Sequence, residues 1–137
     1  MIGILIVSHQ ELGNALIDCT RFILGQQPEA LAAVSIDLRE NAADLRTKIE
    51  KGIKQVDHGK GVLILTDMFG GTPSNLSYSF LEEGHIEVIS GVNLPILIKA
   101  VGLRGEKELS SLAQALETFG KKSISLASGI LKGNKRG

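Results

Sequence analysis

The chain has 137 residues, 43% of them apolar and 22% charged, which is ordinary for one globular domain that buries a core of its own. Fifteen basic residues balance fifteen acidic ones. This balance argues against a general nucleic-acid binder or a protein of anionic membranes, whose affinity rests on excess Lys and Arg.

The chain begins with an apolar run. Residues 2–7 show no polar alternation, which predicts a strand buried on both faces. The run has neither a basic leader nor a cleavage-site pattern, and no stretch of the chain approaches the length of a membrane span. We therefore expect a soluble protein of the cytoplasm.

Helical spacing follows, and Gly25 is a plausible stop. The residues expected to face inward are Leu12, Ala15, Leu16, Cys19, Phe22 and Ile23. As the sole cysteine, Cys19 excludes an internal disulfide and a multi-cysteine zinc site. Its apolar surroundings predict that it is buried filler.

The rest of the chain continues this alternation. Residues 30–36, 61–66 and 86–89 are predicted strands, and residues 123–127 a last short strand. Three helices are predicted from their N-terminal caps, and a last amphipathic helix from its apolar spacing. The caps are Asn41, Thr72 (followed by Pro73 at the first helical position) and Asn93, and the last helix covers 109–119.

Strand–helix alternation at this spacing predicts an α/β fold with an open, mostly parallel sheet and helices on both faces. We expect a single domain over residues 1–130, followed by a basic tail over residues 131–137. In such sheets, ligands bind at the carboxyl ends of the strands, where strand order reverses. The loops after Val7, Thr66 and Ser90 are therefore the candidate site.

The first of these loops contains Ser8 and His9, followed by Gln10. Imidazole is a nucleophile at neutral pH because one ring nitrogen carries a free lone pair. If the first and third strands are neighbours, Asp67 faces this loop and can accept a hydrogen bond from the other ring nitrogen. Such a bond fixes the tautomer and presents the free nitrogen to an electrophile.

The loop after the third strand also suits an anion. Gly70 and Gly71 allow close approach of the backbone, and Thr72 opens a helix that runs on through Asn75. The loop after the fourth strand contains Gly91 and Asn93, which form either a third wall of the site or merely a turn and a cap. The spacing predicts no cluster of metal ligands, and we expect no metal and no cofactor.

Three segments together resemble the mannose-family IIA components of the bacterial phosphoenolpyruvate-dependent sugar phosphotransferase system. They are Ser8-His9, the run from Asp67 to Asn75 with its Gly-Gly-Thr-Pro core, and Gly91-Val92-Asn93 with Pro95. Many members of that family have Gly directly after the histidine, whereas this chain has Gln10. The phosphocarrier domain of dihydroxyacetone kinases shares the early histidine but is not expected to contain Asp-x-Phe-Gly-Gly-Thr-Pro.

The resemblance implies a phosphotransferase in which His9 takes a phosphoryl group from phospho-HPr and passes it to a histidine of a separate IIB component. Asp67 then orients the imidazole, and the Thr72 hydroxyl lies near the phosphoryl group. It also implies a homodimer in which the last strand is exchanged and runs antiparallel, with membranes reached only through permease subunits. A regulatory protein, whose phosphorylation state is read by a binding partner, stays open as the alternative.

Overall fold

The computed structural model describes residues 1–132. In this part of the chain the elements are, in order, β1 (Gly3–His9), α1 (Leu12–Leu24), β2 (Leu31–Ile36), α2 (Ala42–Val56), β3 (Val62–Thr66), α3 (Thr72–Tyr78), β4 (Ile86–Ser90), α4 (Leu94–Leu103), α5 (Leu109–Lys122) and α6 (Ala127–Leu131).

The four strands form one parallel sheet in the order β2-β1-β3-β4. After β1 the chain turns to one side for β2, and it then crosses to the other side for β3 and β4. Strand order thus reverses between β1 and β3, where Val7 pairs with Thr66. The predicted α/β fold with a parallel sheet is confirmed, and the expected ligand edge lies at the ends of these two strands.

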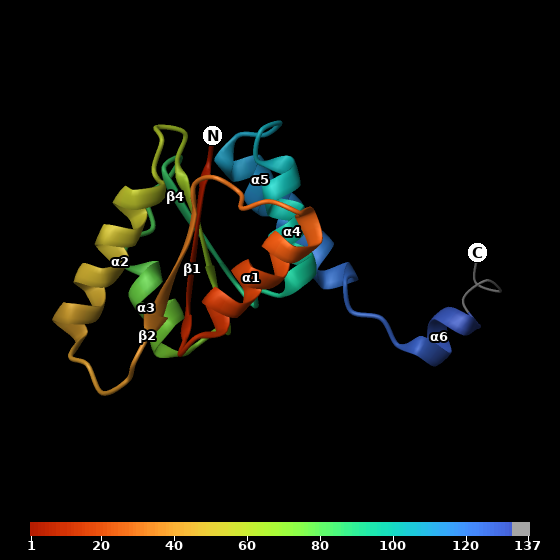
Figure 1. Cartoon of the computed structure of the whole chain (residues 1–137), viewed down its shortest axis with the longest axis horizontal. Helices are drawn as coiled ribbons and strands as arrows, with labels where there is room; N and C mark the ends of the chain where they lie inside the picture. The colour runs from red at the N-terminus through yellow and green to blue at the C-terminus, as the bar shows by residue number, and fades with distance from the viewer. Residues whose placement is uncertain (133–137) are drawn as a thin grey trace.

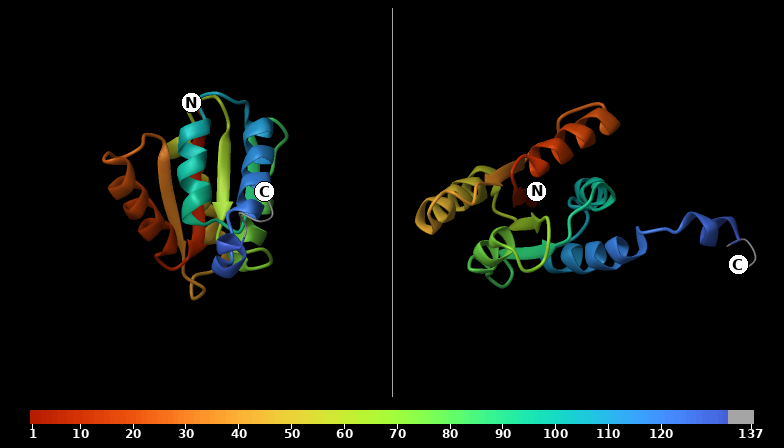
Figure 2. Two further views of the ribbon diagram at one scale, coloured as in Figure 1. Left: turned by 90° about the vertical axis from the view of Figure 1, so that its right-hand side faces the viewer. Right: turned by 90° about the horizontal axis from the view of Figure 1, so that it is seen from below.

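Helices cover both faces of the sheet, as Figure 1 shows, with α2 and α3 on one side and α1, α4 and α5 on the other. Because successive strand residues point to opposite faces, the sheet divides the core into two clusters. Ile4, Ile6, Leu63 and Leu65 pack with α4 and α5, whereas Leu5, Val7 and Ile64 pack with α2. Figure 2 shows these layers from two further sides.

The helix caps mostly follow the prediction. The Asn41 side chain accepts a hydrogen bond from the backbone N–H of Asp44 at 2.9 Å, and the Asn93 side chain accepts one from Ile96 at 2.9 Å. The predicted cap at Thr72 is wrong by one residue, because the extended Gly71 precedes the helix and Thr72 is its first residue. The Ser74 hydroxyl accepts from Gly70 and donates to Gly71, which leaves the Thr72 hydroxyl unused as a cap.

The inward face predicted for α1 is wrong. The residues that α1 buries are Gly13, Ile17 and Thr20, whereas Leu12, Cys19, Phe22 and Ile23 are exposed. The reason is close packing: a Cβ at Gly13 would come within 3.0 Å of Ile6 and 3.1 Å of Ala33. The face that α1 turns to the sheet carries Gly13 and Thr20 beside Ile17, and Leu16 packs at its margin.

The C-terminal segment also differs from the prediction. Residues 123–126 form no strand, and Ala127 begins α6, so the antiparallel strand expected over residues 123–127 is not found in the single chain. In Figure 1 this segment leaves α5 and projects away from the sheet, where it has no strand to pair with. Of the predicted basic tail, Leu131 and Lys132 are described, and the remainder lies outside the described residues.

Across residues 1–132, none of the helices has both the length and the apolar character that crossing a bilayer requires.

Candidate active site

The two predicted chemical residues meet at the strand-order reversal. His9 is the last residue of β1, and Asp67 directly follows β3, the neighbouring strand. The Asp67 oxygen Oδ2 lies 2.8 Å from the ring nitrogen Nδ1 of His9 and accepts the backbone N–H of His9 at 2.9 Å. The parallel pairing of β1 and β3 therefore makes the contact that the sequence only allowed.

The environment of Asp67 keeps it ionised. Its side chain is only 9% exposed, and its other oxygen, Oδ1, is buried without a hydrogen-bond partner in the described part of the chain. Burial alone acts to raise the pKa of the Asp67 carboxyl, but the two hydrogen bonds and the charge interaction with His9 outweigh it. The net pKa lies below the usual value of a carboxyl group.

This contact selects one tautomer of His9. A carboxylate accepts hydrogen bonds and donates none, so Nδ1 carries the proton and Nε2 carries the free lone pair. The His9 side chain is 33% exposed, so the ring reaches solvent while one edge is held by Asp67. The arrangement presents an oriented nitrogen nucleophile to molecules outside the protein.

The glycine-containing loop lies beside that nitrogen. A Cβ at Gly71 would come within 3.1 Å of His9 Cε1 and 3.6 Å of Nε2, so the missing side chain leaves space at the reactive edge of the ring. Gly70 has φ +90°, which favours glycine and turns the loop. Thr72 is half-buried, and its hydroxyl forms no hydrogen bond with the described residues.

The residues flanking His9 hold the loop. Ser8 is buried, and its hydroxyl accepts the backbone N–H of Gly13 at 2.9 Å, which ties the end of β1 to α1. Gln10 has an exposed side chain and a left-handed backbone with φ +51°, and its N–H donates to Ile36. Asn75 is exposed on α3. The described contacts therefore give Ser8 a structural role, while Gln10 and Asn75 remain predicted site residues.

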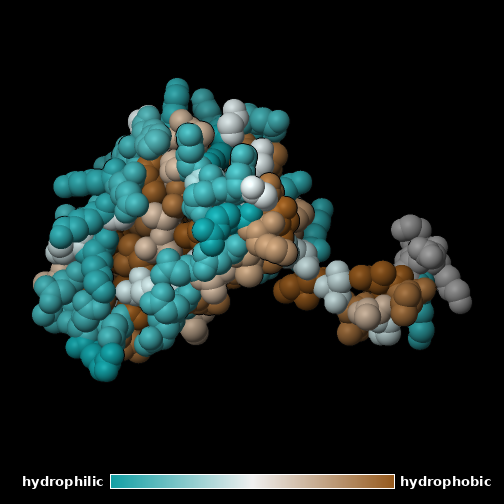
Figure 3. All heavy atoms as spheres, viewed as in Figure 1, coloured by the Kyte–Doolittle hydropathy of each residue, from teal (hydrophilic) through white to brown (hydrophobic). Residues whose placement is uncertain are grey.

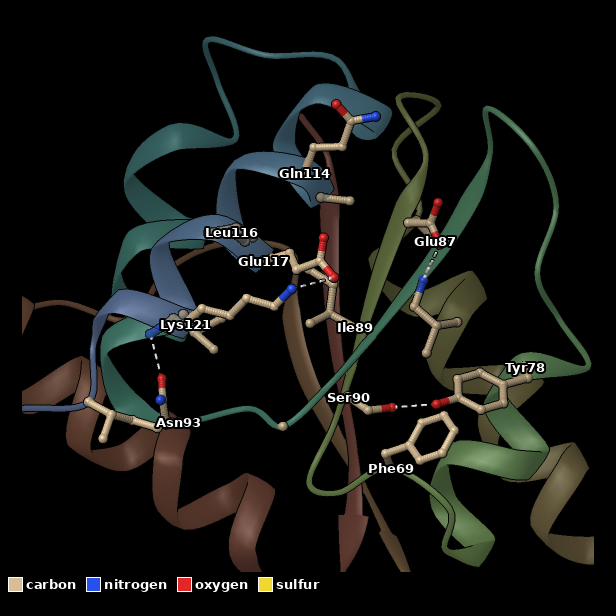
Figure 4. Close-up of a pocket in the computed structure, with 16 residues that line it drawn as sticks. Phe69, Tyr78, Glu87, Ile89, Ser90, Asn93, Gln114, Leu116, Glu117 and Lys121 are labelled. Carbon is tan, nitrogen blue, oxygen red and sulfur yellow. Dashed lines mark hydrogen bonds and ion pairs between the residues drawn. The ribbon is translucent and has the colours of Figure 1, made fainter.

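The third loop serves a different cavity. Gly91 and Asn93 line a 570 Å³ cleft between β4 and α5, shown in Figure 4. Gly91 has φ +100° and its N–H donates to the Thr66 carbonyl. The Asn93 side chain caps α4 and donates to the Ser123 hydroxyl at 3.2 Å. The turn-and-cap interpretation explains both residues.

A hydroxyl network near the site was not predicted. The Thr66 hydroxyl donates to Ser90 at 2.8 Å, and the Ser90 oxygen lies 2.7 Å from the Tyr78 hydroxyl. This network joins the ends of β3 and β4 to α3, and Thr66 directly precedes Asp67. Figure 4 shows the Tyr78–Ser90 part of the network beside Phe69. The only feature of the sequence that could have indicated this network is a polar residue at the end of each of the two strands, Thr66 and Ser90.

Comparison with known proteins gives one consistent result. A family model described as "PTS system fructose IIA component" matches residues 3–117. The chain is 33% identical to the "PTS system fructose-specific EIIA component" of Bacillus subtilis, over 93% of this chain and 88% of that protein. It is also 33% identical to the "PTS system mannose-specific EIIAB component" of Escherichia coli, over 90% of this chain but 39% of that longer protein.

A solved structure agrees with these matches. The crystal structure of "phosphotransferase system component EIIA" from Streptococcus agalactiae superposes with a TM-score of 0.83 and 29% identity, over 93% of this chain and 98% of that one. The sequence match covers both loops that carry His9 and Asp67. The chain therefore belongs to the mannose family of IIA components of the phosphotransferase system.

Proposed function

We propose that the protein is a cytoplasmic phosphoryl carrier that takes a phosphoryl group from phospho-HPr on His9 and passes it to a histidine of a separate IIB component. The observation that carries this proposal is the pairing of His9 Nδ1 with Asp67 Oδ2 at 2.8 Å. The pairing leaves Nε2 as the free nucleophile on a partly exposed ring.

The transfer balances without a cofactor or a metal. The lone pair of His9 Nε2 attacks phosphorus, the P–N bond of the donor breaks, and its electron pair returns to the donor imidazole. Positive charge develops on the His9 ring as the new bond forms, and the ionised Asp67 stabilises that charge. The second transfer is the same step in reverse, with the acceptor imidazole as nucleophile.

Phosphoryl transfer depends mainly on positioning and charge stabilisation. Two features of the loop after β3 support this role. The space left by the missing Gly71 side chain adjoins Nε2. The Thr72 hydroxyl, which has no hydrogen-bond partner among residues 1–132, can donate a hydrogen bond to a phosphoryl oxygen. Gly70, Gly71 and Thr72 are therefore the proposed phosphate-binding residues.

We also propose a homodimer. The edge of β4 lies beside the 570 Å³ cleft. Apart from a bridge between Glu82 and Ile86, this edge pairs with no strand of the described residues. Ile124 and Leu126 of the projecting segment are exposed apolar residues. Antiparallel pairing of residues 123–127 with β4 of a second subunit would cover both surfaces at once.

The decisive test of the carrier function is phosphorylation by the purified system. The parental protein, incubated with labelled phosphoenolpyruvate, the first enzyme of the system and HPr, is expected to take up one acid-labile phosphate per chain. His9→Gln should abolish the uptake while keeping the fold.

A second histidine–aspartate pair provides a matched control. His85 Nε2 lies 3.1 Å from Asp57 Oδ2. His85 directly precedes β4, so this pair lies at the amino ends of the strands, whereas His9 lies at their carboxyl ends. His85→Gln should be labelled like the parental protein. Undiminished labelling of His9→Gln would remove His9 as the phosphorylated residue.

A further inference from the structure

The loop that connects β3 to α3 is anchored at both of its ends. At its start, Asp67 is bonded to His9. At its end, the Ser74 hydroxyl accepts the backbone N–H of Gly70 at 2.9 Å and donates to the Gly71 carbonyl at 3.0 Å. Ser74 is completely buried and lies in the first turn of α3. One side chain therefore bonds both glycines of the loop, which we call the glycine pair.

The glycine pair needs such an anchor because its own sequence leaves it free to move. Glycine loses more conformational entropy on ordering than any other residue, and here two glycines stand in succession. Gly70 has φ +90°, and a Cβ built on it would meet nothing within 4 Å. Met68 and Phe69, which precede the pair, have exposed side chains. Among residues 1–132, the two bonds to Ser74 are the only side-chain hydrogen bonds that the glycine pair makes.

The position of the glycine pair decides how much room the nucleophile has. A Cβ at Gly71 would lie 3.1 Å from His9 Cε1 and 3.6 Å from Nε2, so the Gly71 backbone is a close neighbour of the reactive edge of the ring. Movement of this backbone toward the ring would close the space for a phosphoryl group. Phosphoryl transfer depends on positioning, and a misplacement of about 1 Å can cost about a hundredfold in rate. The restraint on the glycine pair is therefore a restraint on the reaction.

We propose that Ser74 is a positioning residue for phosphoryl transfer, and that its hydroxyl holds the glycine pair in the geometry that phosphorylation of His9 requires. The proposal rests on the proposed carrier function. No hydrogen bond joins Ser74 to His9 in the described chain, so Ser74 acts through Gly71. Its hydroxyl hydrogen is donated to the Gly71 carbonyl, and the phosphoryl group therefore takes no proton from Ser74.

Ser77 provides a matched control for a variant of Ser74. Ser77 is also completely buried, and it lies about one helical turn further along α3. Its hydroxyl donates to the Pro73 carbonyl at 2.7 Å and forms no hydrogen bond with the glycine pair. Ser77→Ala therefore removes a buried hydroxyl from the same helix without releasing the loop.

Two variants remove the anchor. Ser74→Ala deletes the hydroxyl, and Ser74→Cys keeps the volume of the side chain but offers only a thiol, which is a weak donor and acceptor. Circular dichroism shows which variants are folded at the temperature of the assay. If Ser74→Ala does not fold, Ser74→Cys decides the question.

Phosphorylation by labelled phospho-HPr is measured over a range of donor concentrations. We expect both Ser74 variants to lower the rate at saturating donor roughly tenfold and to keep KM within about twofold of the parental value, because the reactive edge is altered and the donor-binding surface is not. Ser77→Ala should react at the parental rate. Amide hydrogen exchange at Gly70 should become faster in the Ser74 variants and stay at the parental rate in Ser77→Ala.

Self-association is measured in the same proteins. Phe69 lines the cleft that the proposed homodimer would fill. The apolar residues Ile124 and Leu126 are exposed on the projecting C-terminal segment, where Figure 3 shows apolar atoms, in brown, away from the sheet. A displaced loop could therefore act through the dimer instead of through His9. We expect sedimentation to give the parental protein and all three variants the same mass.

Four results overturn the proposal and leave the carrier function intact. A parental rate in the folded Ser74 variants, or unchanged amide exchange at Gly70, would show that Ser74 does not fix the glycine pair. Equal losses of rate in Ser74→Ala and Ser77→Ala would trace the loss to α3 as a whole. A rise in KM alone would place Ser74 in donor binding, and a changed mass would assign the effect to the dimer. If phospho-HPr does not label the parental protein, the carrier function itself is wrong.

Discussion

One oxygen of Asp67 holds His9 by both its backbone and its side chain. Oδ2 accepts the backbone N–H of His9 at 2.9 Å and lies 2.8 Å from Nδ1 of the ring. The first contact fixes the end of β1 relative to β3, and the second fixes the tautomer. A single carboxylate thus positions the residue and prepares its chemistry.

Replacing Asp67 separates an oriented histidine from one that is merely exposed. Asp67→Asn keeps the shape but can present an amide N–H to the ring, which favours the wrong tautomer. Loss of an orienting carboxylate costs about four orders of magnitude in a serine protease triad. Here we expect a loss of roughly two orders in the rate of transfer from phospho-HPr, because the ring itself is the nucleophile and relays no proton.

Asp57→Asn is the control for that measurement, since Asp57 pairs with His85 at the opposite edge of the sheet. It should transfer at the parental rate, and circular dichroism should show both variants folded. A folded Asp67→Asn protein with parental transfer would make Asp67 purely structural.

The lowered pKa of Asp67 predicts how stability depends on pH. Because this carboxyl has a lower pKa folded than unfolded, its ionised form stabilises the fold above about pH 4, and the contribution is lost as the pH falls through the folded pKa. The difference in free energy of unfolding between the parental protein and Asp67→Asn should therefore narrow on acidification. Urea unfolding at pH 6, 5, 4 and 3 measures this difference in free energy, in steps of about one pH unit. A difference that stays constant contradicts the lowered pKa.

Gly71→Ala tests the space beside the nucleophile. Gly71 has φ −98°, which alanine adopts without strain, so the variant adds only a Cβ, 3.1 Å from His9 Cε1. We expect phosphorylation to slow roughly ten- to a hundredfold as the ring is displaced. Gly102→Ala is the control, because its Cβ meets nothing within 4 Å. Equal rates for the two variants would show that the phosphoryl group does not need this space.

Gln10 and Ala30 are the two non-glycine residues with positive φ in the described part of the chain. The left-handed conformation costs an L-residue roughly 1–2 kcal/mol, which glycine avoids. Gln10→Gly should therefore raise the free energy of unfolding by roughly 0.5–1 kcal/mol, after the entropy that glycine adds to the unfolded chain. Gln26→Gly, at an exposed position without positive φ, should not stabilise. Stabilisation by both variants, or by neither, would contradict the strain at Gln10.

The proposed homodimer predicts a mass of twice 14.6 kDa on sedimentation at micromolar concentration. Leu126→Glu places a charge in the segment that would pair with β4, and should shift the protein to monomer. Leu38→Glu, an exposed apolar residue outside that segment, should leave the mass unchanged. A parental monomer removes strand exchange and leaves the carrier chemistry at His9 intact.

Features that depend on neighbouring residues could be predicted from the sequence alone. Residues 2–7 and 61–66 were predicted as strands buried on both faces because polar residues do not alternate with the apolar ones. The structure confirms this, since β1 and β3 are almost wholly buried. Asn41 and Asn93 were predicted as caps, and both side chains accept a hydrogen bond from a backbone N–H in the first turn. His9 and Asp67 were placed at strand ends for the same local reason.

Which distant residues meet depends on the tertiary structure. The pairing of β1 with β3 brings Asp67 within 2.8 Å of a residue 58 positions away, and no local pattern specifies which strands are neighbours. The tertiary structure also decided the orientation of α1, which turns Gly13, Ile17 and Thr20 to the core, and a Cβ at Gly13 would come within 3.0 Å of Ile6. Residues 123–127 were apolar enough for a strand, but a strand forms only where another strand offers its backbone groups. In the described chain, β4 ends the sheet, but residues 123–126 do not pair with its edge.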